Sequence, residues 1–148
     1  MKVGFKSDTG LKRSNNEDAC FVLLSEKLYL VADGVGGGNA GEIASRTTVS
    51  EIANFISNNP IENATNKYAI VNYFQGCLDK INKKIFDMAR KYEQNKGMAT
   101  TLTLLYAKGG MAYIGNVGDS RVYLYRDNEL VQLTEDHTYV NTLVKAGI

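Results

Sequence analysis

The sequence is poor in histidine and cysteine, and this shortage excludes several kinds of site. It contains one histidine, His137, and two cysteines, Cys20 and Cys77. These residues are too few for an intramolecular zinc site of the Cys/His type, so any metal has to be held mainly by carboxylates. A Ser-His-Asp or Cys-His mechanism would have to use His137 alone.

Net charge and long apolar runs are also lacking. Seventeen basic and sixteen acidic residues give a net charge of +1, which argues against a nucleic-acid or membrane-surface binder driven by bulk electrostatics. No apolar run reaches the length of a membrane span, and the first residues contain no apolar signal core. The cysteines lie among apolar neighbours, as is typical of proteins from a reducing compartment. The expected location is therefore the cytoplasm, without nucleic-acid or membrane partners.

The length and composition are those of one globular domain. The chain has 148 residues, of which 44% are hydrophobic and 22% charged, so it can bury a substantial core. A single proline, Pro60, leaves no proline-rich linker.

The first third of the chain predicts a β-hairpin. Residues 2–7 suggest a short strand and residues 7–16 a polar loop. Apolar runs at 19–24 and 28–32, separated by three residues, predict two paired strands. The second strand is expected to end at the glycine-rich loop 33–38.

Two helices should follow, at about 39–58 and 66–93. The longer one carries apolar residues three and four positions apart: Val71, Phe74, Leu78, Ile81, Ile85, Met88 and Tyr92. Such a seam also suits a coiled coil. Strands on either side of the helix pair favour packing against a sheet or against the first helix.

The last third predicts strands at 100–106, 111–117, 121–125 and 130–133. Turns at this spacing are typical of an antiparallel meander. A final helix is expected from about Thr134, with Gly147 as its stop. The expected fold class is therefore α+β, with a helix pair against an antiparallel sheet.

Acidic residues next to turns are the first candidates for a metal site. Asp33 ends an apolar strand and precedes Gly34, so a rigid carboxylate and a backbone carbonyl could serve Mg²⁺ or Mn²⁺. The alternative is that Asp33 only caps the turn. Glu17 and Asp18 lie just before the first strand, which in a hairpin begins beside the end of the second. Both acids are therefore expected near Asp33.

Two further residues have a functional and a structural interpretation each. Arg13 could hold two phosphate oxygens with its guanidinium, or it could face solvent. Asp119 lies in the turn 118–121, where turn chemistry alone explains an aspartate; the alternative is a third metal position. Residues 36–41 fit the dinucleotide pattern G-x-G-x-x-G, but a second helix follows where that fold needs a parallel strand.

Six segments together resemble the metal-dependent type 2C protein serine/threonine phosphatases (the PPM family), particularly the bacterial form. They are residues 7–18, 31–37, 41–45, 97–103, 116–123 and 133–137. Ala99 stands where the family usually has glycine. The order and spacing of these segments are specific, and the resemblance covers roughly the first three-fifths of the family domain.

The resemblance implies part of an α-β-β-α sandwich of antiparallel sheets, truncated at the C-terminus, with residues 1–148 as an incomplete phosphatase domain. It implies hydrolysis of phosphoserine and phosphothreonine on proteins by a metal-activated water. The complete domain would bind two Mn²⁺ or Mg²⁺ ions, with a third at a weaker position. The implied partners are phosphorylated proteins, among them a Ser/Thr kinase and its substrates.

The resemblance also implies roles for individual residues. Asp33 would bridge the metals as a catalytic residue, and Gly34 would offer its carbonyl. Glu17 and Asp18 would bind or orient metal-bound waters, Arg13 would clamp the phosphate, and Asp119 would serve the third metal. Val35 occupies the position at which the animal enzymes carry a histidine, and His137 is expected to be structural.

Two metals need more carboxylates than these segments supply. The chain as given is therefore expected to be weakly active or inactive. The alternative to a phosphatase is a non-catalytic phosphoprotein-binding or helical interaction module derived from the same fold.

Overall fold

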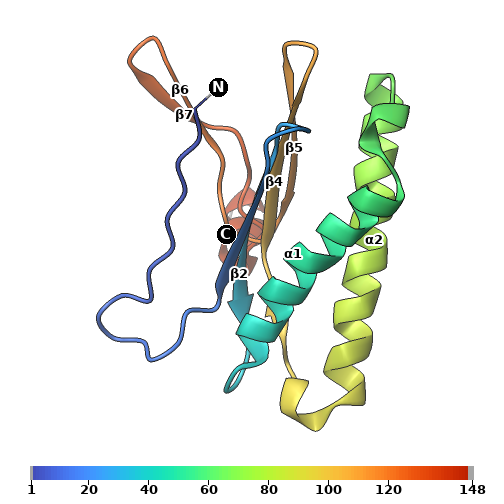
Figure 1. Cartoon of the computed structure of the whole chain (residues 1–148). Helices are drawn as coiled ribbons and strands as arrows, with labels where there is room; N and C mark the ends of the chain where they lie inside the picture. Colours follow the sequence, from blue (N-terminus) through green and yellow to red (C-terminus); the bar gives the residue numbers. More distant parts are fainter. Residues whose placement is uncertain (1, 147–148) are drawn as a thin grey trace.

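The computed structural model describes residues 2–146 and confirms the α+β class (Figure 1). Its main antiparallel sheet has the order β1–β2–β4–β5, and β3 pairs with the end of β2. The strands are β1 (Asp18–Leu23), β2 (Leu28–Val35), β3 (Ala99–Thr100), β4 (Leu102–Lys108) and β5 (Met111–Val117). Two long helices, α1 (Ala40–Asn58) and α2 (Lys67–Lys91), cover one face of this sheet.

Smaller elements complete the chain. Short 3-10 helices, η1 (Ile61–Asn63) and η2 (Glu93–Asn95), lie before and after α2. Strands β6 (Tyr123–Arg126) and β7 (Glu129–Gln132) form a separate two-stranded sheet, followed by α3 (Tyr139–Lys145).

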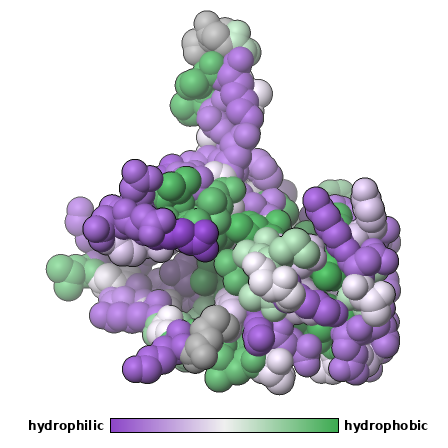
Figure 2. Space-filling view, turned by 90° about the horizontal axis from the view of Figure 1, so that it is seen from above, coloured by the Kyte–Doolittle hydropathy of each residue, from purple (hydrophilic) through white to green (hydrophobic). Residues whose placement is uncertain are grey.

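The core lies between the sheet and the helix pair. Side chains along β2 alternate, so that Leu28, Leu30 and Ala32 are buried against the helices while Val31 is 46% exposed on the other face. This alternation follows from the two-residue period of a strand. Seen from above, hydrophobic side chains gather between flanks of hydrophilic ones (Figure 2).

The apolar seam of α2 packs within the chain, as predicted. Its buried face consists of Ile70, Phe74, Cys77, Ile81 and Ile85, all part of the core cluster that also contains residues of α1 and of the sheet. The predicted seam is wrong at its ends, because Val71 and Tyr92 are 51% and 41% exposed. Ile70 and Cys77 occupy the buried positions instead. Both cysteines are free thiols.

Replacing Ile81 by alanine is expected to lower the free energy of unfolding by about 2–5 kcal/mol, because it leaves a cavity in the core. Val71→Ala, on the exposed side of the same helix, should change it by less than about 0.5 kcal/mol. Urea denaturation followed by circular dichroism measures both values. Equal losses for the two variants would contradict the assigned helix face.

Two predictions for the first third were wrong. Residues 2–17 contain no helix or strand, and the expected strand at 2–7 is exposed chain that belongs to neither sheet. Conversely, the strand predicted to stop at Ala32 continues through Asp33 to Val35. The reason is pairing on both sides: Asp18 lies opposite Asp33, and β3 lies opposite Gly34 and Val35.

The last third departs from the predicted meander after β5, which matches its predicted range. The strand predicted at 100–106 is split at Thr101, and β6–β7 forms its own sheet. The final helix begins five residues later than predicted, because Thr138 provides its cap by accepting a hydrogen bond from the Asn141 N–H. The predicted stop at Gly147 lies outside the described residues.

Among residues 2–146, the helices are too short or too polar to cross a bilayer.

Candidate functional site

Two aspartates face each other at the edge where β1 begins and β2 ends. Asp18 and Asp33 are direct partners in the antiparallel register, which confirms the hairpin argument for Asp18. Partial burial and then the negative charge of Asp18 raise the pKa of the Asp33 carboxyl. Asp119 acts in the same direction and the Arg13 guanidinium in the opposite one. These four side chains therefore share one electrostatic site.

The backbone of Asp33 is fixed by two threonines from the β3–β4 junction. Its N–H donates to Thr101 Oγ1 at 2.9 Å, and its carbonyl accepts from the Thr101 N–H at 2.9 Å and from Thr100 Oγ1 at 3.0 Å. The Asp33 carboxylate therefore projects from a rigid backbone. Sequence analysis did not assign these threonines a role, and their only signal was their place in a family-like segment.

Asp119 reaches the site through the connection that follows β5. The hydroxyls of Ser120 and Thr101 lie 2.7 Å apart, and Thr103 Oγ1 donates to the Ser120 carbonyl at 3.1 Å. Gly118 has a φ of +99°, and a Cβ there would lie 2.7 Å from Thr101 Cγ2. The predicted two-strand turn is wrong, because residues 118–122 join two different sheets.

His137 contacts the backbone of the same connection. Its N–H donates to the Gly118 carbonyl at 2.9 Å, and its Nδ1 lies 3.4 Å from the Gly118 N–H. These contacts fit the structural role expected for this histidine.

Glu17 lies beside Gly34, the residue that follows Asp33. Its backbone carbonyl accepts from the Gly34 N–H at 3.1 Å and from Ser45 Oγ at 2.5 Å. A Cβ on Gly41 would lie 2.7 Å from Glu17 Oε1, so the carboxylate packs against the first turn of α1. Asp18, rather than Glu17, is thus the acid directly beside Asp33, and a metal role for Glu17 stays a prediction.

Gly41 is a third residue, after Thr100 and Thr101, that sequence analysis did not assign to the site. A Cβ at this position would also come within 2.8 Å of the Gly34 carbonyl carbon. Only glycine allows this approach between the end of β2 and the start of α1. A glycine inside the first turn of a predicted helix is a signal that could have identified it.

Arg13 lies in the loop before β1 with 70% of its side chain exposed. Its Nη1 is 4.0 Å from Glu17 Oε2, at the limit of an ion pair. The guanidinium is therefore accessible and close enough to act on the pKa of Asp33. Its phosphate-binding role stays a prediction.

The donor set fits part of a metal centre. Asp18 and Asp33 offer the carboxylate oxygens that Mg²⁺ and Mn²⁺ prefer, and a cation would relieve the repulsion that raises the pKa of Asp33. Within residues 2–146, however, no three acidic, histidine or cysteine side chains gather as a ligand group. The described residues therefore offer a pair of carboxylates at this edge rather than a three-ligand cluster.

Replacing Asp33 by asparagine should stabilise the metal-free chain at neutral pH. A raised pKa means that the folded state binds the Asp33 proton more tightly than the unfolded chain, whose value is near 3.8. The stability from this group is present below that value and is lost as the pH rises through the folded-state pKa. The advantage of Asp33→Asn should therefore grow between acidic and neutral pH in urea denaturation with EDTA. A pH-independent difference would contradict the assigned repulsion.

Comparison with known proteins agrees with this geometry. Residues 11–146 match the family described as protein phosphatase 2C. A putative protein phosphatase 2C-type of Streptococcus pyogenes is 36% identical over 150 residues, which cover 99% of this chain and 59% of the relative. The serine/threonine protein phosphatase PstP of Mycobacterium tuberculosis is 35% identical over 147 residues, which cover 99% of this chain and 27% of PstP.

Solved structures show the same likeness. The catalytic domain of PstP in complex with two manganese ions superposes with a TM-score of 0.81 at 35% identity, covering 96% of this chain and 58% of that one. Stp1 of Staphylococcus aureus gives a TM-score of 0.83 at 34% identity, covering 95% and 55%. The chain thus spans less than two thirds of the length of each of these relatives. By sequence and by fold, it belongs to the protein phosphatase 2C family.

Proposed function

We propose that this chain carries the N-terminal part of a metal-dependent protein serine/threonine phosphatase domain. The observation that carries the proposal is the pairing of Asp18 with Asp33 at one edge of the sheet, where the charges of Asp119 and Arg13 also act on Asp33. The manganese complex of the related PstP catalytic domain supports it. The substrates would be phosphoserine and phosphothreonine in proteins.

The acidic residues of the site would bind the metal, and the basic residue would bind the phosphate. Asp33 and Asp18 would hold a Mn²⁺ or Mg²⁺ ion, and Gly34 could add its carbonyl. Such a metal centre supplies an activated water and neutralises phosphate charge. Arg13 would bind phosphate oxygens through its exposed guanidinium and stabilise the charge that develops on them.

Glu17 and Asp119 are proposed to have supporting roles in this site. Glu17 would orient the loop that carries Arg13, through the contact between their side chains, and would reach the metal only through water. Asp119 would serve a third and weaker metal position near Asp33, on which its charge already acts.

The chain by itself is proposed to be weakly active or inactive, because no three of its described acidic side chains gather as a ligand group and two metals need more carboxylates than Asp18 and Asp33. The same observation favours the second candidate function, a phosphoprotein-binding module without turnover. The cytoplasm as location, and a Ser/Thr kinase whose products the enzyme would reverse, are proposed from the resemblance to the bacterial family alone.

A matched assay tests both proposals. The 1–148 chain and a version extended to the length of the Streptococcus pyogenes relative are incubated with a phosphoserine peptide and Mn²⁺, with EDTA as the control. We expect metal-dependent phosphate release from the extended version and little from the short one. Equal turnover would overturn the proposal that the chain by itself is weakly active or inactive. No turnover from the extended version would overturn the phosphatase proposal.

A further inference from the structure

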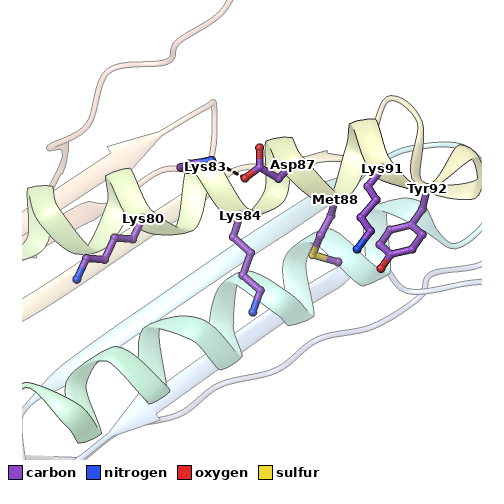
Figure 3. A pocket seen from close by; sticks show the side chains of 7 residues that line it. All are labelled: Lys80, Lys83, Lys84, Asp87, Met88, Lys91 and Tyr92. Atoms are coloured by element: carbon purple, nitrogen blue, oxygen red, sulfur yellow. Dashed lines mark hydrogen bonds and ion pairs between the residues drawn. The ribbon is translucent and has the colours of Figure 1, made fainter.

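The C-terminal half of α2 carries a groove on the side that faces α1. We call it the α2 groove; it has a volume of about 340 Å³. Figure 3 shows the seven side chains that line it: Lys80, Lys83, Lys84, Asp87, Met88, Lys91 and Tyr92. Asp33 belongs to β2 in the sheet, whereas the groove lies on the layer of helices (Figure 1).

Positive charge is concentrated along this part of the helix. Residues 80–91 contain five basic residues and one acidic residue, whereas the whole chain has a net charge of only +1. The rest of the sequence is therefore slightly acidic. A local excess of this kind attracts anionic partners to one surface rather than to the whole molecule.

Only part of this charge is neutralised within the protein. Lys84 forms an ion pair with Glu51 of α1 at 2.8 Å, and Lys83 pairs with Asp87 at 2.6 Å on the outer side of the helix. Lys80 and Lys91 instead lie over the rings of Phe55 and Tyr92, at 5.1 and 5.2 Å. Among the described residues, neither has a carboxylate partner, so both ends of the groove carry uncompensated charge.

The apolar part of the lining is Met88, between the two lysines in the sequence, and Tyr92, directly after Lys91. Met88 is partly buried against the core, and the Tyr92 ring is part of a residue that remains 41% exposed. Lys80 and Lys91 are eleven residues apart, which corresponds to about 16 Å along a helix. An extended segment of about five residues spans this distance. A fitting ligand thus has acidic residues at its ends and an aliphatic side chain in the middle.

We propose that the α2 groove docks an acidic segment of a partner protein, with carboxylates on Lys80 and Lys91 and an aliphatic side chain on Met88 and Tyr92. Asp87 is paired with Lys83 and Glu51 with Lys84, so the charges left for a ligand are those of Lys80 and Lys91.

A fluorescein-labelled peptide, Glu-Glu-Ser-Leu-Ser-Glu-Glu, tests the proposal by fluorescence anisotropy with the 1–148 chain. We expect saturable binding that weakens with added salt, because exposed charges are screened. The double variant Lys80→Glu/Lys91→Glu should raise the Kd about tenfold or more, since attraction becomes repulsion at both ends. A peptide with serine in place of leucine should bind more weakly as well.

The matched control is Lys27→Glu/Lys67→Glu, which makes the same change in net charge on exposed residues at the other end of the helix pair. It should leave the Kd within about twofold, and circular dichroism verifies that both variants fold. Equal weakening by the two variants would overturn the proposal in favour of bulk electrostatics. Absence of saturable binding, or tighter binding to phosphatidylserine vesicles, would also overturn it. The readout is binding, so failure of the phosphatase assay leaves it unaffected.

Discussion

Gly34→Ala is expected to lower the free energy of unfolding by about 3 kcal/mol or more. A Cβ at this position would lie 2.0 Å from the Gly41 carbonyl oxygen and 2.4 Å from its carbon. These are backbone atoms in the first turn of α1, so they cannot rotate out of the way. Either the end of β2 or the start of the helix must move, and the neighbouring Asp33 moves with it.

Gly37→Ala is the matched control, because a Cβ on Gly37 would have no atom within 4 Å. It should change stability by less than about 0.5 kcal/mol. Urea denaturation followed at the helix signal measures both variants. A Gly34→Ala variant as stable as the parent would show that strand and helix do not approach this closely.

Asp33→Asn should lower Mn²⁺-dependent phosphatase turnover more than about 100-fold in the version extended to family length. Loss of a residue that only orients a metal ligand typically costs 10–100-fold, and Asp33 is proposed to hold the metal itself. An amide carries no negative charge, so the cation loses its strongest donor at this edge. Turnover of a phosphoserine peptide across a Mn²⁺ titration measures the effect.

Asp127→Asn provides the control for the loss of one carboxylate. Asp127 lies in the β6–β7 turn with a φ of +54°, a conformation that asparagine also tolerates, and turnover should stay at the parent level. Because Asp33→Asn is expected to stabilise the metal-free fold at neutral pH, lost activity cannot be ascribed to unfolding. Full activity of Asp33→Asn would overturn the metal-holding role.

Features set by neighbouring residues could be predicted from the sequence. The hairpin of β1 and β2 and the buried face of α2 follow from apolar periodicity, and the pairing of Asp18 with Asp33 follows from hairpin geometry. The order of family-like segments predicted the family. Each of these inferences uses contacts between residues close in the chain or a pattern visible along it.

Features set by distant contacts could not be predicted. The strand continues through Asp33 because Thr100 and Thr101, 67 and 68 residues further along, hold its backbone. The carboxylate of Glu17 turns toward Gly41 because a glycine there leaves room for it. The residues next to Asp33 and Glu17 in the sequence do not indicate these distant contacts.

The hairpin of β6 and β7 is expected to open separately from the core of the molecule. All eight residues of its two strands are exposed, and the paired side chains of Arg121 and Asp136 hold its base. A two-stranded hairpin is only marginally stable in water, so its amide protons should exchange with solvent through local opening. Those of β2 and β4, the central strands of the main sheet, require unfolding of the whole core. A denaturation curve recorded at the helices therefore measures the core and says nothing about the hairpin.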